Sequence, residues 1–143
     1  MDIGFAAGTK VLIKKGQKNI ESVTTRDEVL TANGTYRKVS QKMTDKSDDI
    51  YELKILFQPD TKVTGNQRYC IRRKMEDGYS LSRWVPVNDV NVGDLVIVYV
   101  LDDTAPVHRP VKGIKKLNEG QKVYSLKTNE KHSFTANGAV VHD

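Results

Sequence analysis

Short apolar runs separated by turn-forming residues are the dominant pattern of this chain, and no stretch shows strong helical periodicity. The segment 50–57 alternates apolar and polar positions, and the segment 95–100 is the richest apolar run. The apolar members of the first segment are Ile50, Leu53, Ile55 and Phe57. Because successive side chains of a strand point to opposite faces, this alternation predicts a half-buried strand.

Turn signals punctuate these runs at short intervals. Asn-Gly or Asp-Gly pairs stand at Asn33-Gly34, Asp77-Gly78 and Asn137-Gly138. Such pairs favour tight hairpins because both residues tolerate a positive φ. Many short strands joined by such turns predict an all-β fold. The chain contains no low-complexity segment, tandem repeat or domain boundary. We therefore expect one domain over residues 1–143, with residues 1–3 as a leader or upstream flank.

The charge of the chain is basic but spread along its length. There are 23 Lys and Arg residues against 18 Asp and Glu residues, which gives a formal net charge of +5. The nearest approach to a basic patch is Arg72-Arg73-Lys74, which Glu76 and Asp77 follow closely. We interpret this run as a solvated hairpin rather than as a nucleic-acid contact. The charge pattern therefore does not favour a polynucleotide ligand.

Cys70 is the single cysteine and lies between Tyr69 and Ile71 in a strand-like run. We predict a buried core thiol rather than a nucleophile. One cysteine provides neither a disulfide framework nor a zinc ligand set, and we expect no metal and no cofactor. The sequence has no signal peptide and no apolar run long enough to span a bilayer. We therefore expect a soluble, cytoplasmic protein without a membrane partner.

The stretch 123–143 is the part around which the rest of the chain is organised. Two short apolar strands flank a polar turn, and the second strand carries His142 and Asp143 at its end. Strands normally fade into poorly ordered residues at a terminus. Here the strand stops on Val-Val-His-Asp, which indicates that the end of this stretch belongs to a functional site.

Several segments, taken in order, resemble the Hint family of inteins, bacterial intein-like domains and hedgehog autoprocessing domains. The family opens on a Cys followed by Phe-x-Ala-Gly-Thr-x-Val, continues through Val-Thr-x-x-His, and closes on His-x-Phe and Val-His-Asn. The matching segments of this chain are residues 4–11, 18–21 with 27–30, 63–67, 84–87 with 92–94, and 123–143. No segment is specific alone, but their order and the closing Val-His-Asp together are.

The resemblance implies a compact, pseudo-two-fold β fold in which strands from both halves bring the chain ends together. It also implies protein splicing or self-cleavage, performed on the protein's own flanking segments (exteins) by a minimal domain without the family's endonuclease. In the family, a Cys or Ser attacks its preceding peptide bond while the Thr-x-x-His pair holds and protonates that amide. A terminal Asn then cyclises to a succinimide, assisted by its neighbouring His and by the His of the His-x-Phe turn.

Three catalytic positions of the family match here, namely Thr64, His132 and His142. Three others are substituted: Gly4 replaces the attacking Cys, Gln67 the activating His and Asp143 the cyclising Asn. Glycine carries no nucleophile, a Gln amide donates hydrogen bonds but has no accessible pKa, and Asp lacks the amide nitrogen. Lys131 also stands where inteins commonly have an acidic residue. The resemblance therefore implies an inactive, monomeric form with no small-molecule substrate.

Simpler interpretations remain open for the candidate residues and for the whole chain. Thr64 is otherwise an ordinary strand residue, and His132 a satisfied turn residue. His142 is otherwise an exposed side chain, and His108 a surface residue of a Pro-flanked loop. One alternative function is a degenerate Hint fold that serves as a structural or interaction module in a larger assembly, such as a phage particle. Another is a small basic β-barrel that binds nucleic acid, which requires exposed aromatic side chains on a basic face.

The resemblance finally predicts a geometry. Because one site of the family handles both splice junctions, we expect Gly4 and Asp143 to lie close together. Thr64, Gln67 and His142 are expected to line one shallow pocket between them.

Overall fold

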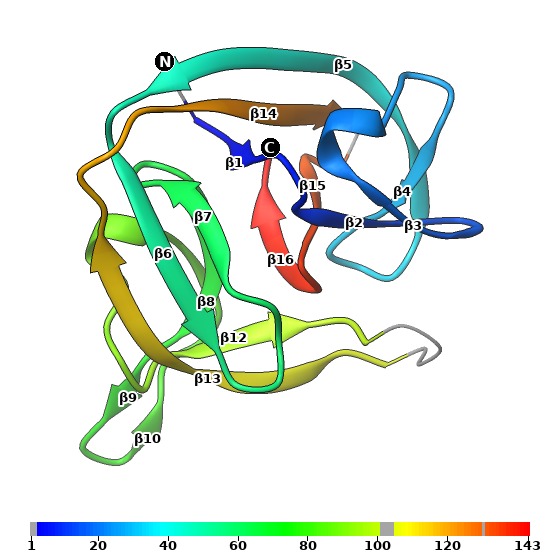
Figure 1. The fold of residues 1–143 in the computed structure, drawn as a ribbon. Coiled ribbons are helices and arrows are strands. Elements are labelled where there is room, and N and C mark those ends of the chain that lie inside the picture. The colour runs from blue at the N-terminus through cyan, green and yellow to red at the C-terminus, as the bar shows by residue number, and fades with distance from the viewer. Residues whose placement is uncertain (1–2, 101–104, 130) are drawn as a thin grey trace.

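The computed structural model describes residues 3–100, 105–129 and 131–143, and residues 1 and 2 of the expected leader lie outside this part. The described chain is built of strands and two single-turn 3-10 helices, η1 (Ile20–Ser22) and η2 (Val87–Asp89) (Figure 1). The first strands are β1 (Phe5–Ala6), β2 (Lys10–Ile13), β3 (Gly16–Asn19), β4 (Glu28–Leu30), β5 (Tyr36–Ser47), β6 (Ile50–Ile55), β7 (Thr61–Thr64) and β8 (Arg68–Arg72). The later strands are β9 (Lys74–Met75), β10 (Gly78–Tyr79), β11 (Arg83–Pro86), β12 (Leu95–Val98), β13 (Val107–Lys116), β14 (Gln121–Thr128), β15 (Ser133–Ala136) and β16 (Ala139–His142).

Most of the described strands join one strongly curved antiparallel sheet. β5 and β14 form a long pair, which runs from Ser47 opposite Gln121 to Val39 opposite Thr128. β6 pairs with β7 and with β13, and β13 continues to β12. In Figure 1, β5 and β14 cross the top of the molecule, β6 and β13 descend on one side, and β15 and β16 lie within this arc. β9 and β10 form a separate hairpin.

Both ends of the described chain enter the interior of this arrangement. Phe5 of β1 lies opposite Tyr124 of β14 and opposite Val63 of β7, so the first strand is flanked on both sides. At the other end, β16 lies beside β8, with Val141 opposite Tyr69, and also pairs with β12. Segments that are most distant in sequence are therefore neighbours in the fold.

Three aromatic rings connect these interior strands. Phe5 of β1 packs edge-to-face against Tyr69 of β8, with ring centroids 6.3 Å apart, and against Phe134 of β15, with centroids 5.9 Å apart. All three side chains are fully buried. Such pairs typically contribute about 0.5–1.5 kcal/mol beyond the burial of apolar area. The core thereby ties the first, middle and last parts of the chain together.

The predicted hairpin turns lie where the sequence indicates them. Residues 33–34 connect β4 to β5, residues 77–78 connect β9 to β10, and residues 137–138 connect β15 to β16. Asn137 has a φ of 49° and Gly138 a φ of 89°, as a turn with two positive φ values requires. Local turn chemistry is thus a reliable guide to these positions.

The expectation of a strand through Phe57 was wrong. β6 ends at Ile55, and Phe57 lies in a turn with a φ of 63° and a side chain that is 79% exposed. The turn is closed by a hydrogen bond from the N–H of Gln58 to the carbonyl of Ile55 at 3.0 Å. The Phe57 ring is covered on one face by the guanidinium of Arg109, 5.1 Å from its centroid. In the sequence, apolar and polar residues continue to alternate after Ile55, but the pairing of β6 stops there.

The basic run 72–74 is also more than a solvated hairpin. Arg73 donates to the carboxylate of Asp94 through Nε at 3.2 Å and Nη2 at 2.9 Å, and Nη2 also donates to the carbonyl of Asp89 at 2.6 Å. Asp94 is buried. Charge-assisted, two-pronged pairing of this kind fixes geometry as well as contributing energy. Arg73 therefore anchors the segment before β12 and is not a free cation on a binding face.

Cys70 is half-buried rather than fully buried as predicted. It lies on β8 opposite Trp84 of β11, beside a small apolar cluster. Burial raises the pKa of its thiol, while a hydrogen bond with Ser82 acts in the opposite direction. A raised pKa lowers the thiolate fraction, so the thiol is not activated as a nucleophile. His108 is exposed as expected but belongs to β13, opposite Ile97, rather than to a loop.

Candidate functional site

Gly4 and Thr64 are joined by two reciprocal hydrogen bonds. The N–H of Gly4 donates to Oγ1 of Thr64 at 3.1 Å, and the N–H of Thr64 donates to the carbonyl of Gly4 at 3.0 Å. Thr64 ends β7, and both residues are buried. The Thr64 hydroxyl therefore contacts the amide nitrogen that links residues 3 and 4. This is the contact that holding an amide at an N-terminal junction requires.

The backbone leaves no room for a side chain at Gly4. Its φ is +151°, and a Cβ atom built there would lie 2.6 Å from the carbonyl oxygen of Tyr124 and 2.9 Å from the carbonyl carbon. Real Cβ atoms do not approach backbone atoms this closely, so any other residue would displace β1 from β14. Glycine is the residue that such a conformation favours. Gly4 thus fits its position sterically, and it carries no group that can attack a peptide bond.

Gln67 connects the turn after β7 to the last strand. Its Nε2 donates to the main-chain carbonyl of His142 at 2.6 Å, and its N–H donates to the carbonyl of Thr64 at 3.2 Å. The side chain is buried. A carboxamide in this place satisfies a buried carbonyl, which would otherwise be costly to leave unpaired. It has no proton to transfer at ordinary pH.

Asn66 precedes Gln67 in the turn between β7 and β8. Its Oδ1 is buried and has no hydrogen-bond partner within the described residues. Buried polar atoms are nearly always paired, so this acceptor is an exception within the fold. No sequence pattern indicates it, because its isolation depends on how the turn packs.

The carboxylate of Asp143 is held by Thr128 at the end of β14. The Thr128 N–H donates to Oδ2 at 2.8 Å, and its hydroxyl lies 3.3 Å from the same oxygen. The Asp143 side chain is only 6% exposed, although it belongs to the last residue described. Sequence reasoning missed Thr128, because a single threonine in a strand carries no distinguishing pattern.

Two imidazole rings flank the same carboxylate. Nδ1 of His132 and Nδ1 of His142 each lie 3.7 Å from Oδ1 of Asp143. The rings are nearly parallel, with an interplanar angle of 10° and centroids 6.4 Å apart. His142 also meets the edge of Trp84 at 5.0 Å, whereas the His132 side chain is 67% exposed. The arrangement places one sheltered and one solvent-exposed proton carrier beside one carboxylate.

The main chain fixes this cluster. The N–H of Asp143 donates to the carbonyl of His132 at 3.0 Å, and His132 has a φ of 50°. Nδ1 of His142 lies 2.9 Å from the main-chain oxygen of Asp143 and 3.4 Å from Nη2 of Arg68. Thr128 is in turn bonded to the backbone of Ser133. The sequence-predicted residues His132, His142 and Asp143 thus form one cluster.

A shallow cavity of about 370 Å³ connects this cluster to the first residues of the chain. Ile3, which precedes Gly4, and Asp143 both line it. The other lining residues are Met43, Thr44, Asp45, Ser125 and Lys127. Ile3, the neighbour of Gly4, and Asp143 therefore open onto one space, and the closeness of Gly4 to Asp143 stays a prediction. The expected lining was wrong, because the residues around this cavity do not include Thr64, Gln67 or His142, and Thr64 and Gln67 are buried.

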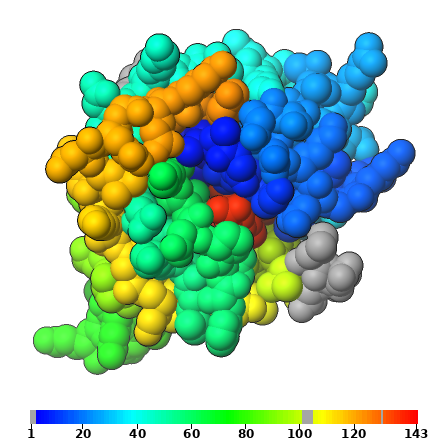
Figure 2. Space-filling view, in the orientation of Figure 1, coloured from blue at the N-terminus to red at the C-terminus, as the bar shows by residue number. Residues whose placement is uncertain are grey.

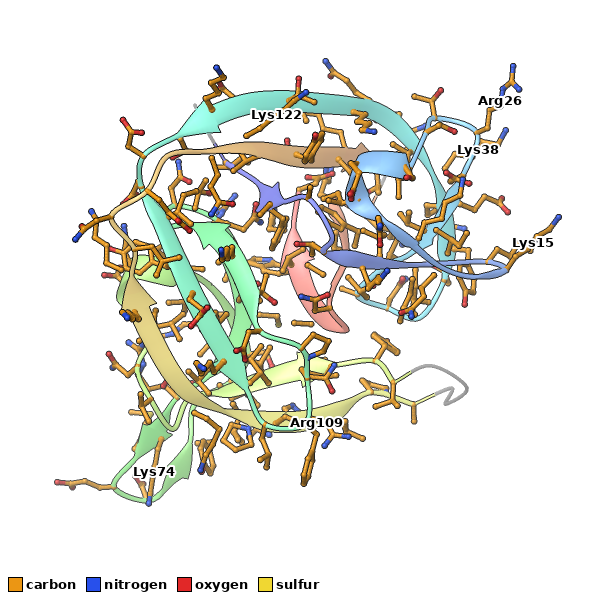
Figure 3. The ribbon with its side chains drawn as sticks, in the orientation of Figure 1. Lys15, Arg26, Lys38, Lys74, Arg109 and Lys122 are labelled. Carbon is orange, nitrogen blue, oxygen red and sulfur yellow. The ribbon has the colours of Figure 1, made fainter. Side chains whose placement is uncertain are left out.

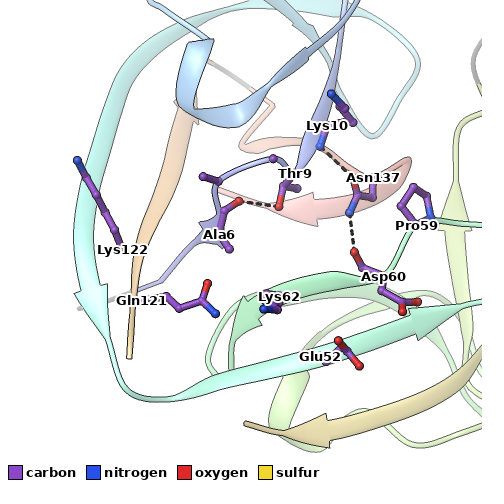
Figure 4. Close-up of a pocket in the computed structure, with 12 residues that line it drawn as sticks. Ala6, Thr9, Lys10, Glu52, Pro59, Asp60, Lys62, Gln121, Lys122 and Asn137 are labelled. Atoms are coloured by element: carbon purple, nitrogen blue, oxygen red, sulfur yellow. Dashed lines mark hydrogen bonds between the residues drawn. The ribbon is translucent and has the colours of Figure 1, made fainter. Parts of the chain in front are cut away.

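A larger hollow of about 650 Å³ lies on another face, between β1 and the segment around Pro59. Figure 2 shows red atoms of the C-terminal hairpin at its floor, between blue N-terminal and green atoms. Asn137 closes this floor: its Oδ1 accepts from the N–H of Lys10 at 2.9 Å, and its Nδ2 donates to the main-chain carbonyl of Asp60 at 3.4 Å (Figure 4). Nδ2 also donates to Oγ1 of Thr61 at 2.8 Å. With its polar atoms engaged in structural bonds, Asn137 acts as a staple between remote strands.

The labelled basic side chains are spread over more than one part of the surface. Figure 3 shows Lys15, Arg26 and Lys38 on one side of the molecule, whereas Lys74 and Arg109 project elsewhere. Several other cations are paired with carboxylates, as in Lys62–Glu119. Across residues 3–100, 105–129 and 131–143, no group of three or more His, Cys, Asp or Glu side chains is placed to hold a metal ion.

Comparison with known proteins identifies the architecture. No protein-family model matches the sequence, and no match is found among the curated proteins. Among solved structures, a bacterial intein-like domain from Clostridium thermocellum matches with a TM-score of 0.77 and 20% identity, over 100% of this chain and 99% of that one. The gp41-1 intein matches with a TM-score of 0.74 and 16% identity, over 100% of both chains. The DnaX mini-intein from Spirulina platensis matches with a TM-score of 0.76 and 19% identity, over 98% and 99%.

The chain therefore has the all-β Hint fold of mini-inteins and intein-like domains. The similarity extends over the whole length, so the resemblance of short segments reflects a shared three-dimensional arrangement. Among the described residues, no helix is long and apolar enough to cross a membrane.

Proposed function

We propose that this chain is an intein-like domain whose site addresses its own flanking polypeptide and that, in this form, it does not splice. The observation that carries the proposal is the shared cavity, which Ile3 and Asp143 both line. Thr64 contacts the amide at one end of this space, and two imidazoles flank the residue at the other. We further propose that the domain acts as a monomer on one pair of flanking segments.

The residues at the N-terminal half of the site support the absence of splicing. Splicing begins with an acyl shift, and Gly4 has no side chain to accept the acyl group. Gln67 spends its amide on the carbonyl of His142 and has no proton to give to a departing amine. Without a thioester or ester there is no acyl group to pass to a downstream residue. These substitutions support the absence of ligation, although the Hint fold is present.

A second candidate is a degenerate Hint fold kept as a structural or interaction module. The observation that favours it is the fit of Gly4, because the backbone around Tyr124 accommodates glycine and no larger residue. This fit is expected of a site adapted to the loss of its nucleophile. A recently introduced glycine would relax into the same surroundings. The two candidates therefore differ in whether the C-terminal residues still react.

The decisive experiment places the chain between two reporter domains. We expect no ligated product, with or without added thiol, because no acyl intermediate forms. The variant Asp143→Asn should release the downstream reporter and leave a succinimide at residue 143, since His132 and His142 are in place to assist. The matched control is Asp143→Asn combined with His142→Ala, which removes the ring nearest the junction and should slow release by ~10²-fold or more. Ligated product from the parent chain, or a folded Asp143→Asn variant that never cleaves, would contradict the proposal.

A further inference from the structure

We propose that, where the polypeptide continues past Asp143, the Asp143 carboxylate itself cleaves the following peptide bond through a five-membered cyclic anhydride. This inference rests on the proposed function, because it uses the same C-terminal junction. It goes beyond it by assigning a nucleophile to the residue that stands in place of the cyclising Asn. The junction would then be cut by an oxygen nucleophile rather than left intact.

The structure holds this carboxylate as a nucleophile must be held. Thr128 fixes Oδ2 through its N–H at 2.8 Å, so the group has one defined orientation. The other oxygen, Oδ1, accepts no bond from Thr128 and faces the two imidazole rings. A carboxylate on a freely rotating terminal side chain would lack this orientation, and positioning of reacting groups is a major part of intramolecular rate enhancement. Thr128 is therefore a positioning residue for the reaction.

The carbonyl to be attacked is also contacted. The main-chain oxygen of Asp143, which becomes the carbonyl oxygen of the scissile bond when a residue follows, lies 2.9 Å from Nδ1 of His142. Arg68 Nη2 approaches the same nitrogen at 3.4 Å, and since arginine only donates, the two contacts compete for Nδ1. The shorter contact favours the tautomer with the proton on Nδ1, and in that tautomer the ring donates to the carbonyl oxygen. Such a donor stabilises the negative charge that develops on that oxygen.

The step balances with water as the only added reactant. Oδ1 of Asp143 forms a bond to its own main-chain carbonyl carbon, and the bond from that carbon to the following nitrogen breaks. The electron pair goes to the nitrogen, which takes a proton delivered from solvent through the ring of His132. That ring is exposed and can be reprotonated from solvent. Water then opens the anhydride and restores an aspartate with two free carboxyl groups.

The test uses the full chain with a reporter domain fused directly after Asp143. We expect slow release of the reporter with a free amino terminus, and at least 100-fold slower release from Asp143→Ala. In ¹⁸O-labelled water the label should appear in the side-chain carboxyl of residue 143 as well as in its main-chain carboxyl, because water can open an anhydride at either carbon. Direct hydrolysis labels only the main-chain carboxyl, and that result would overturn the proposal. Added hydroxylamine should capture the anhydride as a hydroxamate on residue 143.

Two further variants separate positioning from folding. The main-chain N–H of Thr128 remains in both variants, so they test its hydroxyl, which lies 3.3 Å from Oδ2. Thr128→Ser keeps this hydroxyl and should retain the rate within about threefold, whereas Thr128→Val, of similar volume, should lower it about 10-fold, as loss of one hydrogen bond does. Thermal denaturation of both variants shows whether the fold is kept, and a rate that follows stability alone counts against a positioning role.

The Asp143→Asn variant separates a failure of the anhydride proposal from a failure of the proposed function. If it releases the reporter and the parent chain does not, the anhydride proposal fails and the proposed function stands. If both chains are folded and neither releases the reporter, both fail.

Discussion

The carbonyl oxygen of Tyr124 lies 2.6 Å from the position that a Cβ atom on Gly4 would occupy. The first prediction follows from this contact. Gly4→Ala should lower the free energy of unfolding by about 2–4 kcal/mol, because it combines a clash with a backbone conformation that L side chains rarely adopt. Chemical denaturation of the purified domain measures the loss.

Gly8→Ala is the matched control for this prediction. Gly8 also has a positive φ, of 91°, but a Cβ atom there would have no neighbour within 4 Å. It should therefore show only the conformational cost, about 1–2 kcal/mol. Equal losses in the two variants would mean that the approach of Tyr124 to Gly4 relaxes without cost.

The second prediction concerns restoration of N-terminal cleavage. Gly4→Cys alone should react poorly with added thiol, both because Tyr124 resists the new side chain and because Gln67 supplies no proton. Adding Gln67→His should raise thiol-induced cleavage by ~10²–10⁴-fold, the usual contribution of a general acid. Cleavage is followed by electrophoresis of a fusion with an upstream reporter. Identical rates for the single and the double variant would remove the role assigned to position 67.

The third prediction concerns Arg73. Arg73→Met should destabilise the domain by about 2 kcal/mol, because the buried carboxylate of Asp94 loses two charge-assisted hydrogen bonds. Lys74→Met, on the exposed hairpin beside it, should change stability by less than ~0.5 kcal/mol. Urea denaturation compares the two variants. If either variant instead weakens binding to single-stranded DNA by more, in free energy, than it lowers the free energy of unfolding, the nucleic-acid interpretation is favoured.

The fourth prediction is a pH dependence of stability. The pKa of Asp27 is lowered overall: burial acts to raise it, but the N–H of Thr24 and the ammonium of Lys18 stabilise the carboxylate more strongly. A lowered pKa in the folded state stabilises the fold above the unfolded-state value of about 4. This contribution disappears as the pH falls through the folded-state pKa.

Asp27→Asn should therefore be less stable than the parent by about 1 kcal/mol at pH 7. The difference should vanish in acid, where the parent loses the same charge. Asp77→Asn, in the exposed turn between β9 and β10, serves as the control and should be neutral throughout. A gap between Asp27→Asn and the parent that is constant from pH 7 to acid would show that the charge of Asp27 is not the cause.

Local features of the fold could be predicted from the sequence, and features that depend on remote contacts could not. The pair Asn33-Gly34 determines a turn through its own backbone preferences, so the hairpin between β4 and β5 was predictable. The end of β6 was not, because pairing with β7 and β13 rather than side-chain alternation decides that the strand stops before Phe57. Arg73 looked like a solvated cation because its partner, Asp94, lies 21 residues away.

Some features of the candidate site could likewise be predicted from the sequence, and others could not. The substitutions at Gly4, Gln67 and Asp143 are visible in the sequence once the resemblance is recognised. The inability of position 4 to take a side chain is not, since it depends on the backbone of Tyr124 on another strand. Thr128 was missed for the same reason: its significance comes from a contact with Asp143 across a turn.

The position of β1 between β7 and β14 has a consequence for when this domain can act. Phe5 cannot complete its pairing until Tyr124 has been synthesised, and its ring packs against Phe134, which emerges later still. A growing chain on the ribosome therefore has a first strand that lacks its β14 partner until most of this domain has been synthesised, although its β7 partner emerges earlier. The surroundings of Gly4 are completed only late in the synthesis of the domain, so the order of the strands delays any chemistry on the flanking segments.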